Sequence, residues 1–364
     1  MSKNYEDYKP INPMPPRRRR NPMLSFVQYS IIFLLSAALV VSAVYFVALH
    51  NGRDDKGADD EVGKIPSVEP IPEETLPPEQ TEEETDVDEP VVEPIKPGIN
   101  LEDYITVDIP RAQMNKGSLI LVSKNYKAVY PEAGELVDLV KRKSNSYQLS
   151  INTIKVRSEI VDSFNLMMDD FFEATGKTDV TVWTGYRDEA RQTQVYNEYV
   201  AQHGQANSEK YVSKPGESDH HTALGVVLKA FSRGAAYNLD ELDGYSWLEE
   251  NCSKYGFVER YPEDKVDVTG IDYSASFYLR YVGKPHAEFM AKNGICLEEY
   301  IITLKDYTFG NAHYEYTTED GTSYEIYYVR AEGEGENVSV NVPKDKEYTV
   351  SGNNMDGFIV TVKK

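Results

Sequence analysis

The sequence predicts a mixed α+β domain that is followed by a short C-terminal β segment and preceded by an N-terminal transmembrane helix and a disordered linker. Three observations support this fold class. Residues 26–49 form a 24-residue apolar run, an acidic stretch without aromatic residues follows it, and from Leu101 onward apolar positions recur first at helical and then at period-two spacing. At roughly 100–200 residues per domain, the length allows one large or two modest domains beside these appendages.

Charge is distributed unevenly along the chain. The formal net charge of −22 divides into +5 for residues 1–53 (seven basic, two acidic), −13 for residues 54–97 (three basic, sixteen acidic) and −14 for the rest (28 basic, 42 acidic). Because no basic stripe exists outside the first twenty residues, the sequence argues against nucleic acid as a partner. With two cysteines, it also excludes a small disulfide scaffold.

Residues 26–49 are predicted to cross the membrane. The run contains no charged residue, and at 1.5 Å per residue it covers about 36 Å, enough for a hydrocarbon core of about 30 Å. Arg17–Arg20 precede it, so the positive-inside rule predicts a cytoplasmic tail (1–25) and an extracytoplasmic domain, in a single-pass protein of the cell membrane. The alternative is a cleaved signal peptide, but Leu49-His50-Asn51 does not offer the expected small-residue cleavage site.

Residues 50–99 are predicted to form a disordered linker. From residue 51 on, the stretch has eight prolines, no aromatic residue and acidic runs such as Glu82-Glu83-Glu84. It cannot bury enough apolar surface to offset its chain entropy, and proline and charge repulsion extend it. We interpret it as a spacer that lifts the following domain off the membrane.

Residues 100–310 are predicted to form the α+β domain. Its clearest helix is Arg157–Thr175, in which a seven-residue apolar stripe from Ile160 to Phe172 predicts a core face and Gly176 follows as a C-cap. Asp188 has the chemistry to cap a second helix, running toward His203. Strands are expected over Ser118–Ser123 and Val180–Thr184, and further helices over Tyr245–Tyr255, Pro285–Lys292 and Leu297–Leu304.

Residues 311–364 are predicted to form the C-terminal β segment. Past Tyr314 the apolar pattern changes to period two, and turns rich in Gly, Asn and Asp separate the runs. The expected strands are Tyr324–Val329, Val338–Val342, Tyr348–Ser351 and Phe358–Val362.

Several ordered motifs lie between Lys116 and Leu304, half of the chain. They are Thr184-Gly-Tyr-Arg187, Pro215-Gly-Glu-Ser-Asp-His-His-Thr222, Gly256-Phe257, Arg260-Tyr-Pro262, Thr269-Gly270 and Arg280-Tyr-Val-Gly283. In this order and spacing they resemble the VanY-type zinc D-alanyl-D-alanine carboxypeptidases. The resemblance implies a small peptidase-like domain, with helices and a mixed or antiparallel sheet, that trims the terminal D-Ala from peptidoglycan stem peptides.

The resemblance also implies a zinc site that this sequence does not complete. The family binds zinc through a His, an Asp seven residues later and a second His, which leaves an open position for water, and a Glu three residues before the second His takes the water's proton. The first His matches His220. The Asp position falls on Val227, which has no lone pair to give a metal.

The Glu and the second His can be placed in two registers. Counted back from the Arg280 motif they fall on Ala275 and Tyr278, and counted forward from Tyr273 they fall on Ser274 and Phe277. Neither register supplies a carboxylate or an imidazole. His220 alone cannot fix a zinc ion, so we expect no cofactor and no catalytic residue at the family positions.

Neighbouring residues offer no clear substitute. Asp219 and His221 flank His220 and would point away from it on an extended backbone. Asp272 stands at the wrong spacing, and His286 is expected at the surface or as a helix cap. Two further histidines, His203 and His313, are expected in loops.

The positions that would hold a peptide are retained. Arg187 matches the family arginine that faces a substrate carboxylate or carbonyl, a task that suits a bidentate guanidinium. Gln192 and Ser218 match further polar positions of the family pocket. The alternatives are an arginine paired with a buried acid, a glutamine on a helix surface and a serine in a turn.

These observations predict a catalytically inactive member of the family that binds peptidoglycan stem peptide or serves as a scaffold or regulator in the cell wall. Two alternatives remain: an active zinc carboxypeptidase with rearranged ligands, and an interaction module that uses the C-terminal β segment. Cys252 and Cys296 would lie outside the membrane, where a disulfide is permitted, and the sequence leaves their pairing open.

Overall fold

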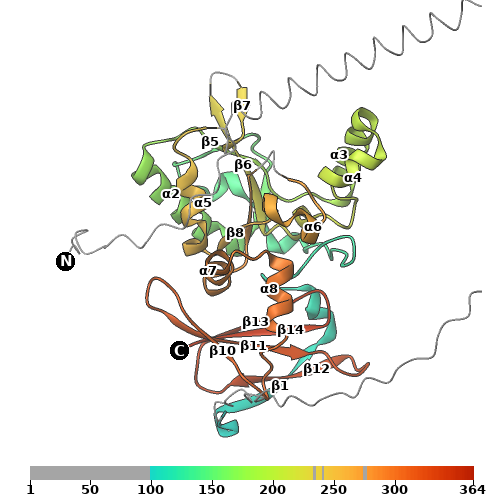
Figure 1. Cartoon of the computed structure of the whole chain (residues 1–364), viewed down its shortest axis with the longest axis vertical. Coiled ribbons are helices and arrows are strands. Elements are labelled where there is room, and N and C mark those ends of the chain that lie inside the picture. Colours follow the sequence, from blue (N-terminus) through green and yellow to red (C-terminus); the bar gives the residue numbers. More distant parts are fainter. Residues whose placement is uncertain (1–98, 233–234, 240–241, 274–276) are drawn as a thin grey trace, which may run out of the picture. The chain divides into compact units, whose positions relative to one another are not determined.

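The computed structural model describes residues 99–364, apart from 233–234, 240–241 and 274–276 (Figure 1). The predicted basic tail, transmembrane helix and linker, residues 1–25, 26–49 and 50–99, therefore lie outside the described residues, except at the last position of the linker. Within the part that the structure describes, no helix is long and apolar enough to span a membrane. All described residues belong to one compact unit of the chain.

The predicted domain is built on a mixed sheet. The strand order is β3-β5-β6-β9-β8, and β7 pairs with the C-terminal residues of β6. Within this sheet only β3 and β5 run parallel to each other. The prediction of a mixed α+β fold is thereby confirmed. The strands are β3 Gln148–Leu149, β5 Val180–Thr184, β6 Gly225–Ser232, β7 Ala235–Tyr237, β8 Phe257–Glu259 and β9 Phe277–Tyr281, and a separate antiparallel pair consists of β2 Leu136–Asp138 and β4 Lys155–Arg157.

Helix α2, Val161–Thr175, covers one face of this sheet. Its apolar stripe packs in the core with alternate residues of β5 and β6, and Gly176 ends the helix in the left-handed conformation at φ 68°, as predicted. The expected stripe was one residue too wide, because Phe172 is 42% exposed. The other helices are α3 Glu189–His203, α4 Gln205–Tyr211, α5 Ser246–Asn251, α6 Val266–Thr269, α7 Lys284–Asn293 and α8 Leu297–Leu304.

The predicted strand at Ser118–Ser123 is wrong. Leu119–Val122 is buried, as its apolar content predicts, but it pairs with no strand. Its backbone groups have other partners: the carbonyls of Ser118 and Ile120 accept hydrogen bonds from the Arg280 guanidinium at 3.0 and 2.9 Å, and the Leu121 N–H donates to the Asn353 carbonyl at 3.1 Å. Because these backbone groups have hydrogen-bond partners, the segment can be buried without pairing with a neighbouring β-strand.

The C-terminal β segment contains the four predicted strands. They belong to an antiparallel sheet of order β10-β11-β14-β13 and to a pair formed by β1 and β12. Strand β1 comes from the start of the region predicted as the carboxypeptidase-like domain, at residue 104, and pairs with β12 over seven residues. The bounds are β1 Tyr104–Pro110, β10 Tyr314–Thr317, β11 Ser323–Arg330, β12 Asn337–Pro343, β13 Tyr348–Gly352 and β14 Gly357–Lys363.

A buried histidine joins this sheet to α7 and α8. His286 on α7 lies 2.6 Å from the Tyr300 hydroxyl of α8 through Nδ1 and 3.0 Å from Thr361 Oγ1 of β14 through Nε2. The expectation of a surface or capping role was therefore wrong. Burial lowers the pKa of His286 to about 3, so the ring is neutral and acts as a hydrogen-bonding link inside the core.

Candidate functional site

His220 lies in a buried 3-10 turn, Asp219–Thr222, and not on an extended backbone as expected. Its Nδ1 lies 2.8 Å from the Gly185 carbonyl oxygen and must carry the hydrogen there, which leaves Nε2 to accept from the Tyr273 hydroxyl at 3.4 Å. Burial, helped by the nearby positive charge of Arg187, holds the pKa of His220 well below its usual range. His220 is thus a neutral imidazole with a protein partner on both nitrogens.

Of the positions that match the family's zinc ligands, Tyr278 lies directly against His220. Val227 on β6 and Tyr278 on β9 are paired across the sheet. The Tyr278 ring stacks on the imidazole with centroids 4.7 Å apart and an interplanar angle of 29°. Phe277 packs in the core on the opposite face, so the geometry favours the register that places the lost histidine at Tyr278. Ala275 and Ser274 lie outside the described residues.

Further tyrosines complete an aromatic cluster around His220. Tyr261 stacks on Tyr278 at 5.8 Å, and Tyr273 lies 5.5 Å from Tyr261 and 5.9 Å from Tyr278. Val227, Tyr261 and Tyr278 are buried together. We use the term aromatic cluster for His220 together with Val227, Tyr261, Tyr273 and Tyr278.

The side chains of the aromatic cluster do not suit zinc. A zinc site of this family needs two imidazoles and a carboxylate around one point, with room for water. Here Val227 offers no donor, and burial raises the pKa of Tyr278 well above its usual range, which opposes a phenolate ligand. Among the described residues no group of three or more His, Cys, Asp or Glu side chains is placed to hold a metal ion.

Beneath the cluster lies a buried charged network that sequence reasoning missed. Asp219 accepts hydrogen bonds from Arg280 Nη1, from Arg260 Nε at 3.3 Å and from the Tyr278 hydroxyl at 3.0 Å. Arg260 also pairs with Glu298 of α8 through two bonds of 2.7 and 3.0 Å. Arg260, Arg280 and Asp219 all stand in the family motifs. Two arginines and an aspartate without an assigned role were the signal in the sequence that could have revealed this network.

The three predicted peptide-binding residues lie near the same turn. The guanidinium of Arg187 donates to Thr184 Oγ1 at 3.4 Å and to Gln192 Oε1 at 3.3 Å, so two of the three meet. Gln192 is only 1% exposed and its amide nitrogen donates to the Ser213 carbonyl at 2.7 Å, which excludes a helix-surface role. Ser218 is buried at the start of the His220 turn, and the structure shows no bond from it to Arg187.

Arg187 is half-buried, yet no ion pair with it occurs among the described residues. Its partners are a hydroxyl and an amide oxygen, which are neutral. The backbone at Arg187 is held by His221, whose Nδ1 donates to the Arg187 carbonyl at 2.7 Å while its Nε2 accepts from the Gly216 N–H at 3.0 Å. A fixed guanidinium without a carboxylate partner suits an incoming carboxylate.

A small pocket adjoins the aromatic cluster at Tyr261 and Ile271. Its volume is about 150 Å³, its lining is partly polar and partly apolar, and two of its lining residues, Lys214 and Glu209, form an ion pair of 2.9 Å. The carbonyl that anchors Gln192 belongs to a lining residue, Ser213. The lining residues are Val122, Ser123, Lys124, Glu209, Val212, Ser213, Lys214, Glu217, Tyr261, Thr269, Gly270 and Ile271.

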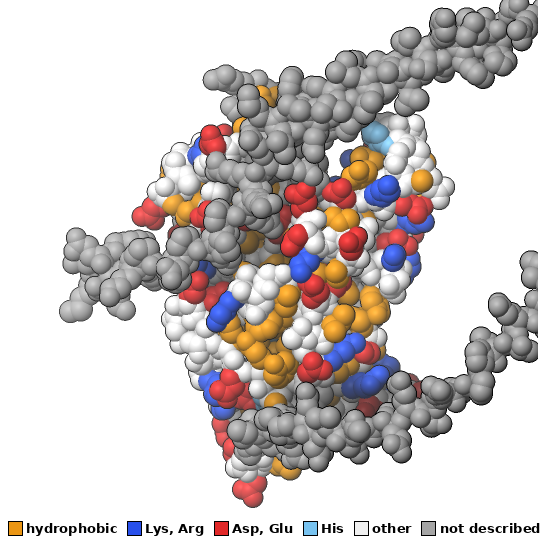
Figure 2. All heavy atoms as spheres, in the orientation of Figure 1, with side chains coloured by type: hydrophobic (Ala, Val, Ile, Leu, Met, Phe, Trp, Pro, Cys, Tyr) orange, Lys and Arg blue, Asp and Glu red, His pale blue; other side chains and the backbone are white. Residues whose placement is uncertain are grey.

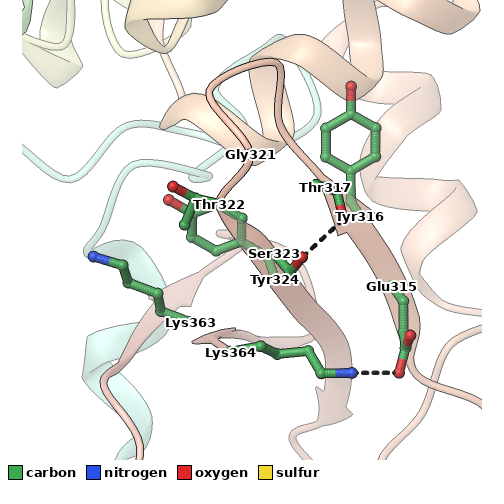
Figure 3. Close-up of a pocket in the computed structure, with 9 residues that line it drawn as sticks. All are labelled: Glu315, Tyr316, Thr317, Gly321, Thr322, Ser323, Tyr324, Lys363 and Lys364. Carbon is green, nitrogen blue, oxygen red and sulfur yellow. Dashed lines mark hydrogen bonds and ion pairs between the residues drawn. The ribbon is translucent and has the colours of Figure 1, made fainter.

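A larger hollow of about 530 Å³ lies on the C-terminal sheet, between the β10–β11 hairpin and the end of β14 (Figure 3). Four of its polar side chains pair with one another: Thr317 and Ser323 lie 2.9 Å apart across the hairpin, and Lys364 bridges to Glu315 at 2.8 Å. It contains no nucleophile–base pair or metal-ligand set, so we assign it no chemistry.

The remaining candidates do not contribute to the site. His203 was expected in a loop, but it is the last residue of helix α3 and is exposed. His313 lies in a loop as expected and is buried beside Glu325 of β11. Cys252 and Cys296 are both buried and unpaired, and burial raises the pKa of each thiol to about 12. On the face that Figure 2 shows, acidic and basic side chains are interspersed.

Comparisons with known proteins identify relatives of this chain. The family model "VanY: D-alanyl-D-alanine carboxypeptidase" matches residues 153–284. A D-alanyl-D-alanine carboxypeptidase of Enterococcus faecium is 32% identical over 260 residues, which cover 70% of this chain and 78% of that protein. Another from Enterococcus faecalis is 34% identical over 149 residues, 38% of this chain and 54% of that protein.

The fold has a solved relative that extends beyond the family model. The vancomycin-resistance D,D-dipeptidase VanXYg, crystallised with a D-Ala-D-Ala phosphinate analogue, is 27% identical and superposes with a TM-score of 0.63, over 72% of this chain and 99% of the other. Motifs, fold and relatives therefore agree: the chain belongs to the VanY family of D-alanyl-D-alanine carboxypeptidases.

Proposed function

We propose that this protein is a membrane-anchored, extracytoplasmic member of the family that binds peptidoglycan stem peptide without hydrolysing it. One observation carries the proposal: an aromatic cluster occupies the surroundings of His220, whereas the peptide-binding arginine is kept. Tyr278 and Tyr273 contact His220, which matches the family's first zinc ligand, and Val227 matches the position of the family's Asp ligand. Without a metal there is no activated water to attack the terminal peptide bond.

Arg187, Gln192 and the adjoining pocket supply what peptide binding requires. A stem peptide ends in a carboxylate, for which Arg187 is the charged partner. Gln192 orients the guanidinium, and the pocket beside Tyr261 accepts a small side chain such as a methyl group. The apolar run at 26–49 and the linker at 50–99 would place this site within reach of the cell wall.

The test is binding of a synthetic stem pentapeptide to the full-length chain in detergent. The parent should bind it, and Arg187→Ala should weaken binding by about 10- to 100-fold, since a hydrogen bond to a charged group contributes about 1.5–3 kcal/mol. Isothermal titration calorimetry measures both affinities. The matched control is Arg142→Ala, which removes an exposed guanidinium paired with Asp162 and should leave the affinity unchanged.

Two outcomes would contradict the proposal. Equal affinity of the parent and Arg187→Ala would show that the family pocket is not used. No binding by the parent would favour the alternative of an interaction module that does not use this pocket.

A further inference from the structure

An exposed aromatic strip extends the candidate site along the central sheet. Its members are Trp183 on β5 and Phe231 on β6, which are 41% and 48% exposed, with Lys229 between them. Side chains alternate between the two faces of the sheet along β6. Val226 and Leu228 pack in the core on the α2 side, so Val227, Lys229 and Phe231 share the opposite face. The strip is therefore continuous with the aromatic cluster at Val227.

Local geometry fixes the tryptophan on this face. The pairing of β5 with β6 shifts register between Val182 and Thr184, which makes Trp183 the bulged residue. Bulges redirect a side chain and are frequent beside functional sites. The Trp183 carbonyl accepts from Ser150 Oγ at 2.8 Å, and the Lys229 ammonium lies 5.5 Å from the centroid of the indole ring. Ser150 thus fixes the backbone at Trp183, and the indole beside Lys229 still presents surface to solvent.

We propose that this strip binds the glycan strand to which the stem peptide is attached, with one sugar ring on each of the two aromatic side chains. A pyranose presents an apolar face of C–H groups, and the electron-rich face of an indole or a phenyl ring attracts their positive edges. Lys229 adds a hydrogen-bond donor with a positive charge, which suits the acetamido oxygen of an N-acetylated hexose. Such an aromatic pair on a rigid sheet would act as an anchor at little entropic cost.

The reach of the peptide agrees with this placement. From Val227 to Phe231 the strand rises about 13 Å, while an extended pentapeptide spans at most about 17 Å. An extended stem pentapeptide is therefore longer than the stretch of β6 between Val227 and Phe231. Thr184, which accepts the Arg187 hydrogen bond, directly follows Trp183 in the chain, so both sites share one stretch of β5.

The inference rests on the proposed function and is tested with two ligands. The full-length chain is titrated with the stem pentapeptide and with the same pentapeptide on a disaccharide of N-acetylglucosamine and N-acetylmuramic acid. We expect the sugar to increase the affinity of the parent at least 10-fold. The double variant Trp183→Ala/Phe231→Ala should reduce this advantage to less than 2-fold while its affinity for the free peptide stays unchanged.

Controls separate stacking from loss of structure. Phe172→Ala removes an aromatic side chain of similar exposure on α2 and should retain the full advantage of the sugar. Trp183→Phe keeps an aromatic face and should retain most of it, and circular dichroism confirms that each variant is folded. Equal affinity of the parent for both ligands would overturn the inference that the strip binds sugar, but not the proposed function. So would a double variant that keeps the full gain in affinity from the sugar. Binding of neither ligand would instead overturn the proposed function, and the strip with it.

Discussion

Replacement of Asp219 by alanine should lower the free energy of unfolding by about 3–5 kcal/mol, the usual effect of removing one partner of a buried ion pair. Asp219 is 1% exposed and accepts from Arg260, Arg280 and Tyr278. Without it, Arg280 has no carboxylate partner among the described residues, and Arg260 retains only Glu298. A buried guanidinium cannot lose its proton to escape the desolvation penalty, so the penalty falls on the folded state.

Urea denaturation of the full-length chain, monitored by its intrinsic fluorescence, measures this change in the free energy of unfolding. The control is Glu347→Ala, which removes an exposed carboxylate 3.7 Å from Lys363 and should change stability by less than about 1 kcal/mol. A loss at Asp219 no larger than that of the control would show that the network does not hold the His220 turn.

A second large effect is expected from restoring the lost ligands. In the double variant Val227→Asp/Tyr278→His, zinc affinity should rise at least 1000-fold over the parent. Val227 and Tyr278 are paired across β6 and β9, and the Tyr278 ring lies 4.7 Å from that of His220, a separation that two imidazoles on one zinc ion can have. Asp219 keeps both arginine partners after Tyr278 is replaced, so the turn should persist.

Competition with a chromogenic chelator measures the zinc affinity, and thermal unfolding gives an independent readout. At a free zinc concentration 100 times the Kd, binding should stabilise the variant by about 2.7 kcal/mol. Adding His220→Ala to the double variant should abolish both effects. If the double variant bound zinc no better than the parent, Val227 and Tyr278 would not stand at ligand positions.

The elements that the sequence predicts best are those whose residue pattern depends only on neighbours in the chain. The α2 stripe with Gly176, the cap at Asp188 and the period-two strands of the C-terminal segment all depend on neighbours in the chain, and the structure confirms them. The segment Ser118–Ser123 was mistaken for a strand because its partners are arginine side chains far along the chain. Likewise β1 pairs with a strand more than 200 residues away, which no local pattern reveals.

The candidate site was predictable where it depends on residue identity. His220, Val227 and Tyr278 could be assigned by motif spacing, as could Arg187 and Gln192. The packing of four aromatic or apolar side chains around His220, and the role of Asp219 as the centre of a charged network, depend on which face each strand presents. The exposed Trp183 follows from a β-bulge, which the spacing of apolar residues does not show.

The proposed function requires that the site bind a stem peptide without cleaving it. The most direct measurement is mass spectrometry of a stem pentapeptide after prolonged incubation with a stoichiometric amount of the full-length chain in zinc-supplemented buffer, with the Enterococcus faecium relative as a positive control. We expect the peptide to co-elute with the chain and to be recovered intact, while the relative releases D-Ala. Release of D-Ala by this chain above the level of a no-protein sample would contradict the proposed function and would favour an enzyme with rearranged ligands.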